Sequence, residues 1–319
     1  MKVKQYSLNG EKTTGRIKEL FRYKIPLLCY APVSYILSLL NYFTHSKKDF
    51  RYKVSICLIF KDEARYLKEW LDYHILIGID HFYLYNNNSS DNFQEVLRSY
   101  IEKGIVTLID FPEKFAQIKA YRDCYEKTKD ETEWLGYIDV DEYVNLIKHN
   151  SIKDLLDSVN FYPSLYLHWR MFGTSGYLEE NYNELTIERY TQAWDHLSTI
   201  GKGFINNNYS THSISVHFHT SKILGFPVLG VQPNKSFVRT THGLRTTGNG
   251  EIAYLNHYWS RSFAFYRYKD FIKGDVANAD NMIVKRKEGR FEKHELNNVT
   301  KDFSIQRWLI FLKIEKKRK

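Results

Sequence analysis

Two aspartates separated by one valine, Asp139 and Asp141, have the spacing in this 319-residue chain that most directly suggests chemistry. They fall at the end of an apolar run expected to form a strand. Residues i and i+2 of extended backbone point to the same side, so both carboxylates should project together, with Val140 turned toward the core. Without a nearby cation such a pair is stabilised by a shared divalent metal, and oxygen ligands favour Mg²⁺ or Mn²⁺. The alternative is a pair that caps the next helix or lies in solvent.

The surrounding sequence predicts alternating strands and helices. The expected strands are residues 54–60, 81–85, 105–110 and 134–139. The expected helices are residues 63–77, a segment through 96–100, and 116–128. This alternation indicates right-handed βαβ units around a parallel sheet. Beyond about residue 160, shorter strand-like pieces at 164–172 and 213–219 predict a mixed second half that closes over one edge of the sheet.

Ligands of open α/β sheets bind beyond the carboxyl ends of the strands. Polar residues occupy three of these ends, at 61–63, 86–91 and 139–142. A metal held at the third end would grip a diphosphate and stabilise the charge that develops on it as it leaves. We therefore expect the functional site at this edge of the sheet.

Positive charge is concentrated at the two ends of the chain. The net charge is +9 overall, +8 over residues 1–53 and +5 over residues 301–319, which leaves −4 for residues 54–300. Proteins that track nucleic acid usually carry a basic stripe across the folded surface, so this distribution argues against nucleic acid. It favours attachment to an anionic membrane surface.

The two ends differ in how they would meet a membrane. Residues 25–45 contain no Asp, Glu, Lys or Arg and are long enough to cross a bilayer, but Pro26 and Pro32 argue against a span. At the other end, the apolar residues 308–312 lie beside a cluster of cations, which is typical of a short interfacial anchor. The alternative for this end is an ordinary helix packed on the domain, followed by a solvated basic tail.

Three cysteines, Cys29, Cys57 and Cys124, form neither a C-x-x-C pair nor an even framework, which favours a reducing cytosol. No secretory signal is recognisable in the sequence. We divide the chain into an N-terminal basic and apolar segment, two halves of one α/β domain, and a basic amphipathic tail. The bounds are 1–50, 51–160, 161–300 and 301–319.

Three segments in order carry a family resemblance: residues 59–92, QIKAYRDC at 117–124, and WLGYIDVDEYV at 134–144. They resemble the nucleotide-sugar half of GT-A glycosyltransferases, and most closely the family 2-like and family 92 (DUF23-type) group. Gly201-Lys202 with Val216-His217, and Asn256-His257-Tyr258 followed by residues 265–274, resemble later elements of that group. The resemblance covers roughly residues 54–275. It implies a GT-A, Rossmann-like sheet that is mostly parallel and flanked by helices.

The resemblance also implies roles for individual residues. Glu63 and Asn86 would seat the nucleoside, and Gln117 would face the donor pocket. Asp139 would contact ribose or metal, and Asp141 would ligate the metal. The remaining residues would complete the metal shell or contact the diphosphate: His257 and His217 as neutral imidazoles, Lys202 and Lys269 as phosphate-pairing cations. Two positions depart from the group, because Asp62 stands where it usually has Asn, and Asn86 where many GT-A enzymes have Asp.

The activity implied is transfer of a hexosyl group from a nucleotide diphosphate sugar, with a UDP-sugar favoured, to a hydroxyl of a glycan or lipid-linked glycan. The resemblance favours inversion, with a carboxylate in the second half taking the acceptor proton, and we nominate Asp195. With cationic ends and no signal, the chain would act at the inner face of a bacterial cytoplasmic membrane, in lipopolysaccharide or surface polysaccharide synthesis.

Two other classes stay open. A nucleotidyltransferase also uses paired aspartates on an α/β sheet, but usually has a glycine-rich loop after the first strand, and residues 60–64 contain no glycine. A non-catalytic glycan- or membrane-binding protein on a degenerate transferase fold is expected to have lost the aspartate pair. That pair is intact here.

Overall fold

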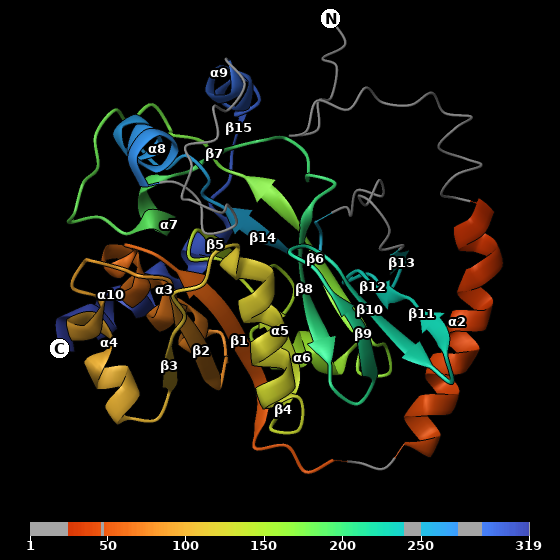
Figure 1. The fold of residues 1–319 in the computed structure, drawn as a ribbon. Helices are drawn as coiled ribbons and strands as arrows, with labels where there is room; N and C mark the ends of the chain where they lie inside the picture. Colours follow the sequence, from red (N-terminus) through yellow and green to blue (C-terminus); the bar gives the residue numbers. More distant parts are fainter. Residues whose placement is uncertain (1–24, 46–47, 239–249, 274–288, 319) are drawn as a thin grey trace, which may run out of the picture.

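A mixed sheet of ten strands forms the centre of the computed structural model, which describes residues 25–45, 48–238, 250–273 and 289–318 (Figure 1). Eight strands follow the order β13-β12-β6-β8-β4-β1-β2-β3, and β14 joins β5 to β6. The strands of this sheet are β1 (Tyr52–Phe60), β2 (His81–Asn86), β3 (Val106–Asp110), β4 (Thr132–Tyr137), β5 (Glu142–Leu146), β6 (Ser164–Met171), β8 (Gly201–Asn206), β12 (Gly230–Val231), β13 (Phe237–Val238) and β14 (Ala253–His257).

Smaller sheets and helices surround it. The remaining strands are β7 (Gln192–Ala193), β9 (Ser210–Ile214), β10 (His219–Ile223), β11 (Phe226–Val228) and β15 (Thr300–Lys301). The helices are α2 (Ile25–Thr44), α3 (Ala64–Leu76), α4 (Phe93–Glu102), α5 (Ala116–Thr128), α6 (Ile152–Asp157), α7 (Thr186–Arg189), α8 (Phe263–Tyr268), α9 (Arg290–Glu295) and α10 (Leu309–Arg318), with a π-helical turn η2 (Lys269–Lys273) and a 3₁₀ turn η3 (Ser304–Trp308).

The first half of the domain is the predicted parallel sheet. Strands β4, β1, β2 and β3 are neighbours and run parallel, connected by α3, α4 and α5. The predicted strand bounds are correct within about two residues, and β4 ends at Tyr137, two residues before the predicted Asp139. The α/β class, with a sheet that is mostly parallel in this half and flanked by helices, is therefore confirmed.

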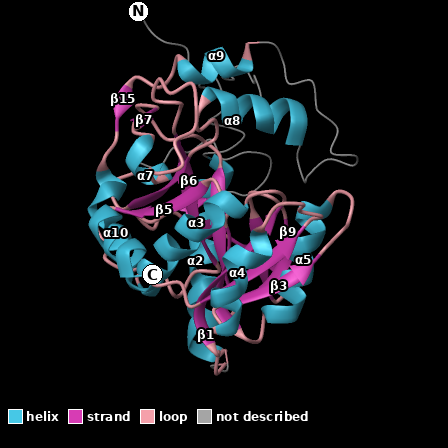
Figure 2. Ribbon diagram, turned by 90° about the vertical axis from the view of Figure 1, so that its left-hand side faces the viewer, coloured by secondary structure: helices cyan, strands magenta, loops and turns pink. Residues whose placement is uncertain are grey.

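Burial on both faces explains the continuous apolar run of β1. Val54, Ile56 and Leu58 point into a large core that includes α3 and α4, whereas Cys57 and Ile59 point into a second core with α5. The alternation follows from the two-residue period of a strand. Figure 2 shows the strands between these helices. All three cysteines are free.

The second half is mixed, as predicted, and extends the sheet at the β4 edge. Strand β8 runs antiparallel to both β4 and β6, while β14 runs parallel to β6 and antiparallel to β5. The prediction of one strand at 213–219 is wrong. Strand β9 ends at Ile214 and β10 begins at His219, because Ser215 and Phe218 close a turn. The Ser215 N–H donates to the Phe218 carbonyl at 2.9 Å, and the Phe218 N–H donates to the Ser215 hydroxyl at 3.0 Å.

The two ends of the described chain were predicted to associate with a membrane. None of the helices in the ranges given above is long and apolar enough to cross a membrane. Of the predicted C-terminal anchor, Leu312 is buried, Trp308 and Leu309 pack against the main core, and the Lys313 ammonium pairs with Glu188. Ile310 and Phe311 of the same segment are 63% and 49% exposed. Helix α10 therefore packs on the domain through part of its surface, and the membrane anchor stays a prediction.

Candidate active site

The acidic pair lies in a tight turn between β4 and β5 and not on a strand. Glu142 closes the turn: its carboxylate accepts the Asp139 N–H at 2.9 Å, and its own N–H donates to the Asp139 carbonyl at 3.0 Å. The indole of Trp70, on α3, donates to the carbonyls of Asp139 and Glu142 at 3.1 and 2.9 Å. Val140 turns inward and is buried, as predicted. The turn is therefore fixed from both the sheet and the helix layer.

Asp139 is held by groups from α5 and β8. Its carboxylate lies 2.8 Å from the Lys202 ammonium and accepts from the Tyr121 hydroxyl at 3.0 Å and the Gln117 amide at 3.4 Å. Lys202 is fully buried. Burial alone would lower the pKa of Lys202, but Asp139, Tyr121 and Glu142 overcome it and hold that pKa well above its ordinary value. The antiparallel β8 thus brings a cation beside Asp139, where the sequence analysis had placed Lys202 on the diphosphate.

Replacing Lys202 with methionine is expected to cost about 3 kcal/mol of unfolding free energy, because it leaves the Asp139 carboxylate without its buried counter-ion. The measurement is urea unfolding followed by circular dichroism. In the double variant Lys202→Met/Asp139→Asn the unpaired charge is gone, so most of that stability should return. If the double variant is as unstable as the single one, the ion pair is not what Lys202 contributes.

Asp141 faces β14 and η2. Its Oδ2 lies 2.6 Å from the Lys269 ammonium and its Oδ1 lies 3.6 Å from Nε2 of His257. The register of β14 against β5 pairs His257 with Glu142, one residue beyond Asp141, which explains the approach. Burial would raise the pKa of Asp141, but Lys269 and His257 hold it well below its usual range. Asp141 is therefore a carboxylate at any pH near neutrality.

Two histidines share the Trp169 ring beside this carboxylate. The centroids of the His257 and His217 rings lie 4.3 and 5.2 Å from it. Burial lowers the pKa of His257, against the pull of Asp141 and Asp139, and lowers that of His217 to about 4. The Nδ1 atom of His217 forms a hydrogen bond with the Gly201 carbonyl at 3.1 Å. Both imidazoles are thus neutral at pH 7, the state required of a metal ligand.

Arg261 is a site residue that the sequence analysis missed. It is fully buried, with its guanidinium 3.3 Å from the Tyr66 ring centroid and 3.5 Å from the Glu63 carboxylate. It also donates to the Val140 carbonyl at 3.2 Å. Arg261 therefore links the loop after β1 to the acidic turn. Its only sequence signal is its place four residues after His257, which does not reveal a contact with Val140.

Many GT-A enzymes have an Asp at the position of Asn86. In this chain a carboxylate is supplied next to it by Asp110. Asn86 ends β2 in register with Asp110 at the end of β3, and its amide donates to the Asp110 carboxylate at 2.9 Å. Its oxygen accepts the Ser89 N–H at 2.9 Å. Asp110 was missed, although a terminal acid on the third strand was the available signal.

The other departure, Asp62, has a conformational explanation. Its φ is +49°, a left-handed conformation that Asn and Asp adopt more readily than other residues with a side chain. Its carboxylate accepts the Ser90 N–H at 2.7 Å, and Asp91 in turn accepts the Ala64 N–H at 2.7 Å at the start of α3. The loops after β1 and β2 therefore hold each other at the carboxyl edge of the sheet.

Asp141 and His257 are two side chains that could serve as ligands of a divalent cation. Within the residues that the structure describes, no three His, Cys, Asp or Glu side chains converge as a metal site. Asp141 and His257 nevertheless present donor atoms 3.6 Å apart. Neighbouring ligands of an octahedral cation at about 2.1 Å lie about 3 Å apart, so a small closure suffices. Lys269 would have to leave Asp141, and Asp139 is already neutralised by Lys202.

Asp195 lies apart from this cluster. Its side chain is 65% exposed and pairs with the neighbouring His196 at 2.6 Å. In the described ranges no hydrogen bond or ion pair joins it to the acidic turn. Its role as a base stays a prediction.

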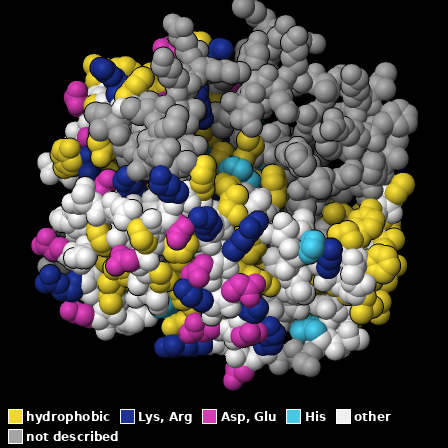
Figure 3. Space-filling view, viewed as in Figure 1, with side chains coloured by type: hydrophobic (Ala, Val, Ile, Leu, Met, Phe, Trp, Pro, Cys, Tyr) yellow, Lys and Arg dark blue, Asp and Glu magenta, His cyan; other side chains and the backbone are white. Residues whose placement is uncertain are grey.

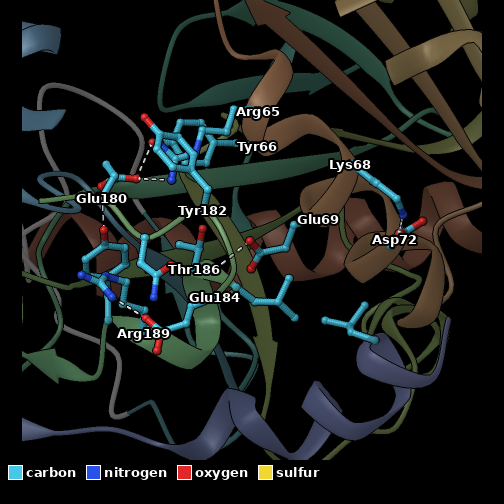
Figure 4. A pocket seen from close by; sticks show the side chains of 14 residues that line it. Arg65, Tyr66, Lys68, Glu69, Asp72, Glu180, Tyr182, Glu184, Thr186 and Arg189 are labelled. Carbon is cyan, nitrogen blue, oxygen red and sulfur yellow. Dashed lines mark hydrogen bonds and ion pairs between the residues drawn. The ribbon is translucent and has the colours of Figure 1, made fainter. Parts of the chain in front are cut away.

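A separate cavity of about 160 Å³ opens between α3 and residues 180–190 (Figure 4). Its polar side chains point toward one another: Arg65 pairs with Glu180 at 2.9 Å, and Glu69 accepts the Thr186 N–H at 2.8 Å. Burial raises the pKa of Glu69 in spite of these donors. The cavity does not contain the acidic turn, and its charges are satisfied internally.

The chain belongs to glycosyltransferase family 92, whose family model matches residues 51–305. A family 92 protein of Oryza sativa subsp. japonica is 30% identical over 129 residues, 39% of this chain and 22% of the relative. One of Ricinus communis is 32% identical over 130 residues, 39% of this chain and 24% of the relative. The galactan β-1,4-galactosyltransferase GALS2 of Arabidopsis thaliana is 27% identical over 162 residues, 47% of this chain and 31% of the relative.

The chain spans less than a third of the length of each of these relatives. Among solved structures, S. aureus TarS 1–349 in complex with UDP is similar with a TM-score of 0.32 and 16% identity, covering 40% of this chain and 38% of TarS. A second structure of TarS 1–349 is similar with a TM-score of 0.34 and 13% identity. It covers 49% of this chain and 47% of the TarS fragment.

Proposed function

We propose that this glycosyltransferase moves a hexosyl group from a nucleotide diphosphate sugar, with a UDP-sugar the favoured donor, to a hydroxyl of a glycan or lipid-linked glycan. One observation carries the proposal. In a family 92 chain, two carboxylates, a neutral imidazole and the cations Lys202, Lys269 and Arg261 converge where the strands of the parallel sheet end. Such a cluster suits a diphosphate, because it offers both cations and a place for a divalent metal.

Donor binding is assigned to the loops at the sheet edge. Asn86 with Asp110, and Glu63 next to Arg261, offer acceptors and an amide for the hydroxyls and base of a nucleoside. Gln117, beside Asp139, faces the same space from α5. Of these, Glu63, Asn86 and Gln117 are the positions that the resemblance implies for donor binding, whereas Asp110 and Arg261 come from the structure.

Asp141 and His257 would hold Mn²⁺ or Mg²⁺. When bound, the cation neutralises the negative charge that grows on the leaving diphosphate. Lys269, which lies 2.6 Å from Asp141, would then be available to pair with a phosphate oxygen as a point charge. Lys202 stays on Asp139 and keeps that carboxylate neutralised within the buried turn, which is a different role from the phosphate contact first expected.

The transfer is a single displacement. The acceptor hydroxyl oxygen forms a bond to the anomeric carbon as the bond from that carbon to the diphosphate oxygen breaks, and the electron pair leaves with the diphosphate. A carboxylate takes the hydroxyl proton, with Asp195 the nominated base, and the configuration inverts. The setting that we propose is surface polysaccharide or lipopolysaccharide synthesis, with the chain peripheral at the inner face of a bacterial cytoplasmic membrane.

The purified chain incubated with UDP-, GDP- and CMP-sugars and Mn²⁺ should release a nucleoside phosphate without pyrophosphate. EDTA should lower that release at least about tenfold, and added Mn²⁺ should restore it. In parallel incubations with UTP or GTP and a sugar 1-phosphate, release of pyrophosphate with formation of the nucleotide sugar would instead identify a nucleotidyltransferase. Absence of turnover with every donor and acceptor would indicate a binding protein, and turnover unaffected by EDTA would exclude the metal from the mechanism.

A further inference from the structure

Helix α2 is amphipathic in the opposite sense to an ordinary surface helix. Its polar residues Ser34, Ser38 and Asn41, spaced at i, i+4 and i+7, face the domain. The Ser34 hydroxyl accepts the Leu229 N–H at 2.7 Å, and the Asn41 amide donates to the Asn208 carbonyl at 3.3 Å. The helix is therefore attached mainly through hydrogen bonds, with edge contacts of the Tyr35 and Tyr42 rings on Phe161.

The apolar face of α2 points to solvent. Seven large side chains are between 36% and 75% exposed: Val33, Tyr35, Ile36, Leu39, Leu40, Tyr42 and Phe43. Figure 3 shows hydrophobic side chains gathered at the edge of the molecule where α2 lies in Figure 1. Patches of this kind on a folded protein mark a surface that is covered in use.

The neighbouring β10–β11 hairpin continues this surface. Its tip places Leu224, 89% exposed, and Phe226, 59% exposed, beside α2, which contacts β11. Leu224 has a φ of +49°, where a hairpin turn ordinarily uses Asn or Asp before Gly. Leu224 is almost fully exposed, so packing within the domain does not explain a leucine in this strained turn position. Insertion of its side chain into an apolar medium would explain it.

We propose that α2 and the Leu224–Phe226 tip form one docking surface that lies in the interfacial region of an anionic lipid bilayer. The helix is not one that could span a membrane, which suits an orientation parallel to the surface. Tyr35 and Tyr42 beside the aliphatic side chains match the aromatic residues preferred at the headgroup level.

Charge identifies the lipid class. Residues 25–45 and 209–238 contain no Asp or Glu, and the second segment contributes Lys222 and Lys235. Residues 1–24, which precede α2 directly, carry a net charge of +5 in sequence. Two copies of such a surface would repel each other, whereas anionic headgroups would attract it. The bilayer is therefore the occupant, and a second copy is an outcome of the test.

The two ends of the chain do not serve the same surface. Figure 1 places α2 and α10 at opposite sides of the molecule. Helix α10 therefore cannot lie in the flat bilayer that α2 would contact. The docking proposal rests on the proposed function in one respect only, because a lipid-linked acceptor would give the enzyme a reason to bind the membrane. Docking itself needs no substrate.

The test is flotation of the full chain with vesicles of phosphatidylcholine alone or with about one third phosphatidylglycerol. The wild type should float with the anionic vesicles and less with the neutral ones. The triple variant Ile36→Gln/Leu40→Gln/Phe43→Gln should lose at least about tenfold in vesicle affinity, because three apolar side chains no longer enter the interface. Leu224→Asn, which suits the turn, should weaken binding without destabilising the fold.

The matched control is Ile310→Gln/Phe311→Gln/Ile314→Gln on α10, which should bind vesicles as the wild type does. Unchanged binding by the α2 variant, or equal loss by the α10 control, would overturn the proposal. So would a wild type that ignores every vesicle but forms a dimer that the α2 substitutions dissociate. Since no donor or acceptor is present, failure of glycosyl transfer would leave these results untouched.

Discussion

Asp141→Asn is expected to lower kcat at least about 100-fold while the protein stays folded. The substitution keeps the shape of the side chain but removes the charge that would hold a divalent cation and that binds Lys269 at 2.6 Å. An amide cannot replace a carboxylate as a metal ligand of comparable strength, and the leaving diphosphate would lose its principal neutralising partner. The measurement is kcat with saturating UDP-sugar and Mn²⁺, beside a thermal unfolding scan of the same sample.

The matched control is Asp130→Asn. Asp130 is an exposed surface carboxylate that pairs with Lys48 at 2.7 Å, so the same chemical change there should alter neither kcat nor the unfolding temperature. A second variant, His257→Gln, should raise the Mn²⁺ concentration needed for half-maximal activity about 10-fold or more. Full activity of a folded Asp141→Asn protein would remove Asp141 from the mechanism. A shift in Mn²⁺ requirement for Asp130→Asn would show that the measurement is not specific to the site.

Sequence was sufficient for the part of the site built by parallel strands. Apolar runs located β1, β2, β3 and β4, and the parallel pairing aligns Phe60, Asn86 and Asp110 in one row. Polar residues just beyond such a row must lie close together. The positions of Glu63 and Gln117 near the acidic turn follow from the same regularity, because each begins or occupies the helix that leaves a strand end.

Contacts across long sequence separations were not predictable. Lys202 reaches Asp139 because β8 inserts antiparallel beside β4, and nothing local in the sequence fixes which strand takes that place. Arg261 reaches the Val140 carbonyl across 121 residues. The turn between β4 and β5 was also missed, because a strand prediction carried through Asp139 had no signal for the Glu142 side chain that closes the turn.

The termini show a third limit. Composition alone predicted an apolar, uncharged N-terminal segment and an apolar, basic C-terminal one. It could not show that α2 turns its hydroxyl and amide side chains inward through Ser34 and Asn41, nor that α10 turns Leu312 inward. Orientation depends on which partners the domain offers, and those partners, Leu229 and Asn208 for α2, are about 170 to 195 residues away in sequence.

The free energy of unfolding is expected to fall by several kcal/mol between pH 7 and pH 5. Burial holds four histidines neutral: it lowers the pKa of His74 and His219 to about 3, and that of His168 and His217 to about 4. In the unfolded chain each would titrate near pH 6.5. Below pH 6.5 these histidines therefore bind protons in the unfolded state but not in the folded state. The free energy of unfolding falls as the pH falls.

The size of the effect follows from the gap between the two pKa values. At pH 5 each of the four histidines would cost about 2 kcal/mol relative to neutral pH, a loss that continues down to the folded-state pKa. Glu142 and Glu69 work in the opposite direction, since burial raises the pKa of both and the folded state then takes up protons first. Four histidines outweigh two carboxyls, so the net change is a loss of stability as pH falls.

Urea unfolding at pH 7, 6 and 5 measures the slope, and one substitution tests its origin. His168→Gln should reduce the pH dependence by close to one proton per molecule below pH 6, whatever its effect on stability at pH 7. The exposed His212, replaced in the same way, should leave the slope unchanged. A free energy of unfolding that is flat from pH 7 to pH 5 would mean that the buried imidazoles accept protons in the folded state. The neutral His257 and His217 required beside Asp141 would then be lost as well.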